Sequence, residues 1–429
     1  MIDALPRLRG RVAVLTGLVC LACTLPYWRA LSLPAISDTY LQVWLGRKYL
    51  HISTWPDLAA DALYRCRATS IWITGIMDAL FGSAPLLLKT QSLFLHIANV
   101  ALIAALGRFP RIGYRISIPA ALLWGFNERH HEAVIWYAAL PEQLVFFFVL
   151  LTLLFWLEWW TKDKPLLYVS AMLSFVLALL SKESAVIACA MLALPVIYEP
   201  QHWRRAVRAA IPFLALSVIY FAANHAAREN HLHWNDGTFK IGWHFLPVIF
   251  NSTARLLSIW GALALAILFW NRKKLDWRLP AIAMLWIPIA LSPYSFVAYQ
   301  PRVPSRHVYL ASLGAAFLLA MALEHLAKRR KIAVSFLAVY LLFNTGYIWF
   351  YKHNQFLERA SVTENLIRDA KLLTAREGLR PLQVSCFPLG AELAALSISD
   401  NLGLPPDQIS VEAVSDQSCG KPTVDLILD

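Results

Sequence analysis

The chain has 429 residues, of which 58% are hydrophobic and 15% charged, and its 39 Lys and Arg outnumber 27 Asp and Glu for a net charge of +12. The apolar residues fall in runs of about 20, the length that crosses a hydrocarbon core of roughly 30 Å. This composition excludes an ordinary soluble protein, and membrane orientation explains the basic balance better than nucleic-acid binding does. We predict an all-α polytopic membrane protein.

Eleven apolar segments are predicted to span the membrane as helices. They cover residues 12–28, 86–107, 114–127, 142–160, 165–181, 185–199, 207–223, 247–270, 279–297, 306–326 and 332–350. The first has no Ala-x-Ala cleavage site, so we interpret it as a retained span rather than a signal peptide. A further apolar stretch, 68–82, is short and carries Asp78. It is predicted to lie along the membrane interface as an amphipathic helix.

The distribution of Lys and Arg gives the orientation of these spans. With 68–82 at the interface, the loops on the side of the N-terminus hold 19 Lys and Arg in 45 residues, whereas the short opposite segments hold 10 in 87. The positive-inside rule then places the N-terminus in the cytoplasm and the C-terminal tail outside. The protein is predicted to reside in the bacterial inner (cell) membrane, with its tail in the periplasm or extracytoplasmic space.

Two segments outside the spans have an organisation of their own. The first external loop, 29–85, is predicted to contain helices at Tyr40–Leu50 and Trp55–Leu63 before the interfacial one, and loops of this length are usually functional. The tail, 352–429, is predicted to form a small α/β domain after a transmembrane catalytic domain of residues 1–351. Its expected elements are helices at Asn354–Glu377 and Ala391–Ser397 and strands at Leu382–Phe387, Ile409–Val414 and Val424–Leu428. Cys386 and Cys419 could form a disulfide there in an oxidising compartment.

Asp38 is the first candidate for chemistry, because it is the only acidic residue of the stretch PAISDTYLQVWLGRKYLH that follows the first span. Asp is a preferred helix N-cap, and Ser37-Asp38 precedes a helical stretch, so a structural explanation is open. The alternative is a general base at the membrane surface that removes a proton from an attacking hydroxyl or amine.

The stretch NERHHEAVIW, 127–136, places several ionisable groups between two spans. They would be costly in lipid unless they face water or a site. A solvated loop, a metal site and a role in catalysis are the three interpretations. The metal site is the weakest, because no His-x-x-x-His or Cys-x-x-Cys spacing accompanies the histidines.

Two further external motifs carry cations. In LLSKESAV, Lys182 and Glu183 occupy a tight connection between spans, where they form either a simple turn or a point charge for a lipid phosphate. In QPRVPSRHVYLAS, Arg302 and Arg306 are four residues apart and Tyr309 follows one turn later. These arginines either snorkel to the interface or clamp a phosphate at a helix N-terminus.

These motifs, in this order, resemble the GT-C superfamily of membrane glycosyltransferases, most closely the protein O-mannosyltransferases that carry tetratricopeptide repeats. The resemblance covers roughly residues 10–325 and rests on the order and spacing of the pieces rather than on any one of them. The matching pieces are SDTY, LYRCRATSIW before LFG, LHIAN, FNERHHEAVIWYAALPEQL, LLSKES and SRHVYLASLG.

The resemblance implies a GT-C fold with horizontal helices in the first external loop, a sugar donor on a polyprenyl phosphate, and transfer with inversion at the anomeric carbon. It implies that Asp38 is the catalytic base. The donor phosphate would then be bound by Arg65, Lys182, Arg302 and Arg306. Donor or acceptor would be positioned by His130, His131, Glu132, Glu183 and Tyr309. No cofactor is required for this chemistry, and a divalent metal stays only as an alternative.

The chain also departs from this family. Thr39 stands where many members have a second acidic residue, and Cys66 and Arg67 replace the Pro-Leu of a Tyr-Arg-Pro-Leu motif. The tetratricopeptide repeats are absent, so the acceptor, a glycan, a lipid or a protein, is not inherited from the family. Two other functions stay open from the sequence: an O-antigen ligase or polymerase, and a transporter or flippase for a glycolipid. No nucleic-acid partner is expected.

Overall fold

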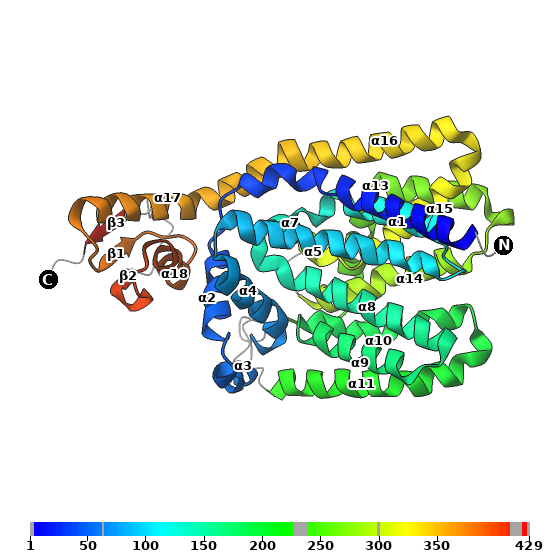
Figure 1. Ribbon diagram of the computed structural model, residues 1–429, viewed down its shortest axis with the longest axis horizontal. Helices are drawn as coiled ribbons and strands as arrows, with labels where there is room; N and C mark the ends of the chain where they lie inside the picture. Colours follow the sequence, from blue (N-terminus) through cyan, green and yellow to red (C-terminus); the bar gives the residue numbers. More distant parts are fainter. Residues whose placement is uncertain (1–3, 62–63, 227–238, 298–300, 412–422, 427–429) are drawn as a thin grey trace.

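The protein is mostly helical, with a helical bundle at one end of the long axis and a small α/β unit at the other (Figure 1). The computed structural model describes residues 4–61, 64–226, 239–297, 301–411 and 423–426. Within these residues six helices are long and apolar enough to cross a membrane, or seven if the bent pair Gly10–Ala22 and Leu25–Ser32 counts as one span. The predicted class, a polytopic helical membrane protein, is therefore confirmed.

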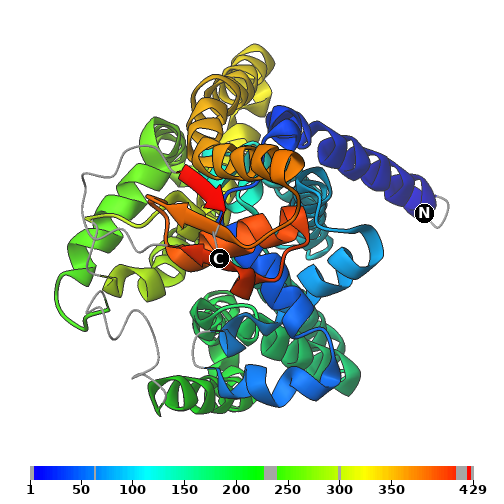
Figure 2. The same cartoon turned by 90° about the vertical axis from the view of Figure 1, so that its left-hand side faces the viewer.

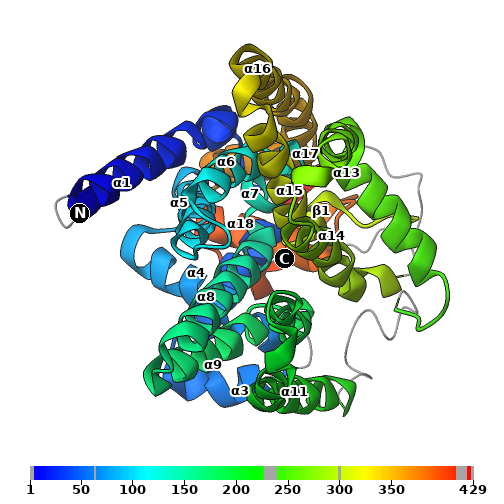
Figure 3. The ribbon, with the colours of Figure 1, turned by 90° about the vertical axis from the view of Figure 1, so that its right-hand side faces the viewer.

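Each of the eleven predicted spans falls on helical structure. The corresponding α-helices are α1 (Ala4–Ala22), α5 (Pro85–Ala105), α6 (Tyr114–Gly125), α8 (Leu140–Lys162), α9 (Pro165–Leu179), α10 (Ala188–Met191), α11 (Trp203–Ala226), α13 (Phe245–Trp270), α14 (Arg278–Leu291), α15 (Ser312–Leu326) and α16 (Arg330–Gly346). The sixth span, 185–199, is the least regular, because short 3-10 segments flank α10. Figure 3 shows the bundle from the end that carries the N-terminus.

The basic loops predicted to share one side do lie together at that end. Arg108 pairs with Glu158, Arg111 contacts Glu199 at 2.7 Å, and Arg205 contacts Asp163 at 2.6 Å. These ion pairs join the loops after α5, α8 and the sixth span, at the end of the molecule away from the α/β unit (Figure 1).

Three helices of the loop 29–85 lie at the end of the bundle that carries the α/β unit: α2 (Asp38–Lys48), α3 (Trp55–Ala60) and α4 (Ala68–Phe81). They confirm the three helices predicted there. In Figure 1, α2 runs across the direction of α5 and α8. It packs against α4 so closely that a Cβ on Gly75 would lie 2.4 Å from the carbonyl oxygen of Gly46.

The tail folds as predicted into a small α/β unit. Its elements are α17 (His353–Glu377), β1 (Leu382–Ser385), α18 (Ala391–Leu402), β2 (Ile409–Val411) and β3 (Thr423–Leu426). The sheet has the order β2-β1-β3, with β1 parallel to β2 and antiparallel to β3. The buried residues Leu382 and Val384 of β1 pack with Leu366 of α17 and Ile398 of α18. Cys386 is disulfide-bonded, while its predicted partner Cys419 lies outside the described residues.

The α/β unit rests directly on α2, in front of the bundle (Figure 2). The guanidinium of Arg47, in the last turn of α2, contacts Asp78 of α4 at 2.7 Å and Asp400 of α18 at 2.6 Å. Beside this ion pair, Tyr40 of α2 is buried against Leu396 of α18. The tail is therefore attached to the same helix that begins with Asp38.

The contact between α2 and α4 gives a first testable prediction. We expect Gly75→Ala to lower the unfolding free energy by about 1–3 kcal/mol, because the new methyl group would overlap the Gly46 backbone. Thermal unfolding in detergent measures this change. Gly17→Ala, in α1, is the control, since no atom lies within 4 Å of its new Cβ. Equal unfolding temperatures for Gly75→Ala and the parent protein would contradict the prediction.

Candidate functional site

Asp38 is the first residue of α2, and its carboxylate reaches across to the segment after α7 (His131–Ile135). The indole Nε1 of Trp136 donates a hydrogen bond of 2.6 Å to its Oδ1. Burial raises the pKa of Asp38 to about 6, although the Trp136 hydrogen bond and the charges of Arg306 and Arg67 act in the opposite direction. A carboxyl with this pKa is mostly ionised at neutral pH and can still accept a proton efficiently.

Asp38 lines a cavity of ≈ 680 Å³. One part of its lining is polar, and includes Asp38, Gln42, Arg67, Glu142, Lys182, Glu183, Arg306 and His307. The other part is apolar and aromatic, and includes Leu41, Leu45, Val186, Ile187, Tyr220, Phe221, Ile241, Phe296 and Val297. The cavity can therefore hold a ligand with both a charged and a greasy portion.

Arg306 is the cation of this cavity that is most closely linked to Asp38. Its guanidinium lies 5.0 Å from the centre of the Trp136 ring, which itself donates to Asp38. The carboxylate of Glu132 contacts Arg306 at two points. It accepts a 3.0 Å hydrogen bond from the Arg306 backbone N–H and lies 3.7 Å from the guanidinium. Glu132 thus orients a cation of the cavity.

Lys182 belongs to a buried ionic group on another wall of the cavity. Its Nζ pairs with Glu142, and the same carboxylate accepts hydrogen bonds of 2.6 Å from both Tyr294 and His307. The lysine also lies 5.1 Å from the centre of the Tyr294 ring. The charge of Lys182 is therefore already matched by Glu142, which leaves it less to offer an incoming phosphate.

The first external loop contributes Arg67 to the cavity, whereas Arg65 points elsewhere. The Arg65 guanidinium donates to Asn224 Oδ1 at 3.3 Å and to the Ala223 carbonyl at 2.8 Å, at the end of α11. Arg67 lines the cavity, and its buried Nε has no hydrogen-bond partner among the described residues. Of the two arginines, Arg67 is the one placed to contact a ligand.

His130 and Tyr309 lie in the aromatic interior of the bundle and do not line the cavity. His130 Nε2 is 2.7 Å from Ser312 Oγ, and its ring centre is 4.6 Å from that of Tyr309. The Tyr309 hydroxyl lies 2.8 Å from His96 Nδ1. Burial lowers the pKa of His130 well below its usual value, so it is a neutral packing residue here.

His131 and Arg302 lie on another side of the same loops. His131 is buried, and its Nδ1 lies 2.6 Å from the Glu128 carbonyl oxygen. Arg302 is exposed and lines a separate small hollow with Val303 and Pro304. The extended backbone of Pro304 (ψ 157°) precedes the first turn of η13 (Ser305–Val308), so the four-residue spacing does not put Arg302 and Arg306 on one helical face.

The NERHHE segment is thus a folded and buried part of the protein rather than a solvated loop. Glu128–His130 forms a 3-10 turn and His131 begins α7. The residues that the structure describes contain no group of three or more His, Cys, Asp or Glu placed to hold a metal ion.

Among the cavity residues that were not predicted site residues, five take part in the contacts described above: Arg67, Trp136, Glu142, Tyr294 and His307. Trp136, Glu142 and His307 belong to the motifs described in the sequence. The prediction instead chose neighbouring residues in those motifs as site residues. Tyr294 had no sequence signal, because it reaches Glu142 only through the packing of α8 against the segment after α14.

Two solved structures share a similar overall arrangement with this chain. ArnT from Cupriavidus metallidurans, solved with undecaprenyl phosphate bound, matches at a TM-score of 0.48 and 15% identity, over 92% of this chain and 76% of that one. An oligosaccharyltransferase from Archaeoglobus fulgidus, solved with zinc and sulfate, matches at 0.48 and 13%, over 85% of this chain and 56% of that one. The chain thus spans just over half of that second protein.

No protein-family model matches the chain, and no curated protein matches it in sequence. At these identities and TM-scores the two structural likenesses say nothing about individual residues or activity. The fold itself defines the class of the protein, an integral membrane protein of mostly helical, polytopic type with a small C-terminal sheet.

Proposed function

We propose that this protein is a GT-C-type glycosyltransferase that transfers a sugar from a polyprenyl-phosphate donor to an acceptor on the extracytoplasmic face of the membrane. The single observation that carries the proposal is the composition of the Asp38 cavity. The half-buried carboxylate of Asp38, two arginines and a long apolar wall line the same space. These are the groups needed to accept a proton, bind a phosphate and hold a prenyl chain, and the ordered motifs of the sequence support the same assignment.

The reaction follows from the position of the charges. The acceptor hydroxyl or amine attacks the anomeric carbon of the donor sugar while Asp38 takes its proton. The bond between that carbon and the phosphate oxygen breaks on the opposite face, so the configuration inverts and polyprenyl phosphate leaves with the electron pair. Arg306 and Arg67 stabilise the charge that develops on the departing phosphate. In a glycoside hydrolase, a carboxylic acid stabilises the leaving group by giving it a proton.

Asp38 suits the role of base better than Glu142, a buried carboxylate of the same cavity. Glu142 pairs with Lys182 and accepts hydrogen bonds from Tyr294 and His307, so its oxygens are stabilised in the ionised form. The side-chain hydrogen bond recorded for Asp38 comes from Trp136. Glu142 therefore acts as the structural anchor of Lys182, and Asp38 as the proton acceptor.

The proposal includes an orientation and a number of spans. We infer eleven spans, an N-terminus in the cytoplasm, and an α/β unit outside the bacterial inner membrane. The ion pairs among basic loops at one end support this arrangement, as does the disulfide of Cys386 at the other, since disulfides persist in oxidising compartments.

The pKa of Asp38 predicts the pH dependence of transfer. Because only the ionised carboxylate accepts a proton, kcat/KM should fall about tenfold per pH unit below the pKa of about 6 and level off above it. Trp136→Phe removes a hydrogen bond that lowers the pKa of Asp38, so we expect this acid limb to move to higher pH by roughly one unit. The phenyl ring retains a stacking surface for Arg306.

A pH profile of kcat/KM for the parent protein, Trp136→Phe and Trp55→Phe tests this expectation. Trp55 lies in the same loop as Asp38 but packs against Trp72, with ring centres 4.6 Å apart, so its profile should match that of the parent protein. An acid limb at the same pH in all three proteins would show that the group titrating is not Asp38.

The function is tested most directly with purified protein in proteoliposomes supplied with two kinds of donor. We expect release of polyprenyl phosphate and a glycosylated acceptor from monophosphate-linked sugars. Transfer only from diphosphate-linked oligosaccharides would favour a ligase or polymerase. Movement of intact glycolipid across the bilayer without any new glycosidic bond would favour a flippase.

A further inference from the structure

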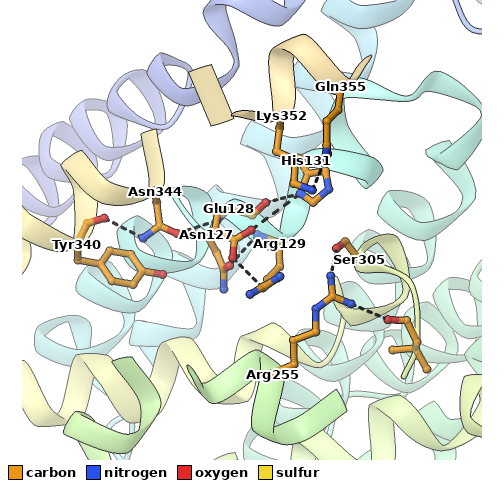
Figure 4. Close-up of polar contacts among 11 residues, drawn as sticks. Asn127, Glu128, Arg129, His131, Arg255, Ser305, Tyr340, Asn344, Lys352 and Gln355 are labelled. Carbon is orange, nitrogen blue, oxygen red and sulfur yellow. Dashed lines mark hydrogen bonds and ion pairs between the residues drawn. The ribbon is translucent and has the colours of Figure 1, made fainter. Parts of the chain in front are cut away.

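Arg306 follows a short stretch of irregular backbone that a neighbouring helix holds in place. Figure 4 shows Arg255 of α13 extending toward Ser305, the residue directly before Arg306. One guanidinium nitrogen of Arg255 donates a 3.0 Å hydrogen bond to the Val303 carbonyl, and another donates one of 2.9 Å to the Ser305 hydroxyl. Arg255 does not line the cavity described above. Its link to the cavity is the backbone that carries Arg306.

Two more side chains of α13 hold the same stretch. The Ser252 hydroxyl accepts a 3.0 Å hydrogen bond from the Val303 N–H. The Asn251 amide donates one of 3.2 Å to the Pro301 carbonyl. Positions 251 and 252 precede Arg255 by four and three residues, so the three side chains share one face of the helix. This face of α13 therefore contacts the stretch from its beginning to its end.

The stretch depends on such contacts because its own structure is weak. Pro301 and Pro304 have no backbone N–H to donate. The turn that follows, η13, is only four residues long, and a single 3-10 turn makes few hydrogen bonds of its own. Local structure alone therefore does not fix the position of Arg306.

Nearby carboxylates balance the charge of Arg255. Glu132, which accepts the hydrogen bond from the Arg306 backbone N–H, also attracts the Arg255 guanidinium electrostatically. Glu128 attracts it as well, against the repulsion of Arg129. Because its charge is balanced in this way, Arg255 is not a cation that awaits a ligand, and its recorded hydrogen bonds to neutral oxygens orient the backbone.

The helix that carries Arg255 is bent close by. Ser258 lies three residues further along α13 with φ 47° and ψ −155°, and it marks a kink between two helical parts. A residue other than glycine is strained at this positive φ, and such strain persists where surrounding contacts hold it. The hydrogen bonds from α13 to residues 301–305 are contacts of this kind. The kink thus sets the direction of the part of α13 that carries Arg255.

We propose that Arg255 is a positioning residue that holds the backbone of residues 303–305 so that the Arg306 guanidinium faces the phosphate of the donor. The inference rests on the proposed transfer function, which assigns Arg306 to that phosphate. Arg255 reaches its two acceptors with two nitrogens of a planar group, and a single ammonium nitrogen reproduces this only in part. Loss of these contacts lets Arg306 move away from Trp136, and a small misplacement of such a group is costly.

The test measures binding of farnesyl phosphate, a short polyprenyl phosphate, to the full-length protein in an uncharged detergent by titration calorimetry. We expect Arg255→Gln to raise the dissociation constant about tenfold, and Arg255→Lys to recover part of the loss. Ser252→Ala removes a contact to the same backbone without a change of charge, and we expect a loss of about threefold there. Arg272→Gln, an exposed arginine just beyond the far end of α13, is the matched control and should bind like the parent protein.

A double variant shows whether the effect passes through Arg306. If it does, Arg255→Gln combined with Arg306→Gln should bind no more weakly than Arg306→Gln alone. A general loss of stability would instead weaken binding by the same factor in both backgrounds. Losses that add would overturn the positioning role, and so would parent-like binding by both Arg255→Gln and Ser252→Ala.

The results for the positioning role and for the transfer function are separable. A parent protein that binds farnesyl phosphate and shows the non-additive pattern, yet transfers no sugar, would overturn the transfer function and retain the positioning role. A protein that transfers sugar but shows additive losses would retain the function and lose the positioning role. Absence of farnesyl phosphate binding by the parent protein would overturn the positioning role, while the donor assay would still decide the function.

Discussion

Asp38→Asn is expected to reduce kcat for sugar transfer by about 10²- to 10⁴-fold, the usual contribution of a general base. The amide has nearly the shape of the carboxylate, so it can occupy the same place at the start of α2 next to Trp136. It cannot accept the proton that the acceptor loses. Because burial holds the pKa of Asp38 at about 6, the parent protein has its base ionised at neutral pH, and the variant has none.

The measurement is single-turnover release of polyprenyl phosphate from a defined donor, with the thermal unfolding temperature as a check on folding. Asp57→Asn is the matched control, since Asp57 is an exposed carboxylate in α3 of the same external loop. It should transfer sugar like the parent protein. Full activity of a correctly folded Asp38→Asn variant would remove Asp38 from the role of base.

Arg306→Gln is expected to lower kcat/KM for the donor by about 10²- to 10³-fold, comparable to the loss of a preorganised donor of positive charge in other enzymes. Its guanidinium lies over Trp136 and is held by Glu132, so it is fixed before the substrate binds. Arg306→Lys should restore only a small part of the activity, because an ammonium cannot reproduce planar stacking and bidentate contact with a phosphate.

A smaller loss is expected for Glu132→Gln, which keeps the acceptor for the Arg306 backbone N–H but removes the charge behind the guanidinium. Donor titrations with both variants give the two values of kcat/KM. Arg359→Gln, an exposed arginine of α17, is the control for loss of one positive charge on this face. Equal losses in Arg359→Gln and Arg306→Gln would indicate a general effect of charge and not a contact with the donor.

Much of the fold could be predicted because its determinants are local. The span 247–270 is mostly apolar and forms α13, and the period of the tail residues 354–377 matches α17 almost to the residue. Strand β1 was recognisable from its alternating pattern, since Leu382 and Val384 face the core while Gln383 and Ser385 are less buried. The placement of basic loops at one end followed from counting charges alone.

The site was less predictable because its geometry is tertiary. Arg302 and Arg306 have helical spacing in the sequence, but Pro304 keeps the first of them outside the helix and turns it to another surface. Lys182 and Glu142 are 40 residues apart, so no motif could reveal that the lysine already has a partner. Histidines near a suspected site drew attention to His130, which instead packs against Tyr309 and lies next to Ser312 in the interior of the bundle.

The ion pairs of Arg47 couple the C-terminal unit to the helix that begins with Asp38. One guanidinium at the end of α2 joins α4 to α18 of the C-terminal unit, and Asp38 begins the same α2. A truncation after residue 352 would uncover Tyr40, leave Arg47 with Asp78 alone, and loosen the helix that presents the base. Exchanging the C-terminal unit with that of another protein would therefore require α2 to be exchanged along with it.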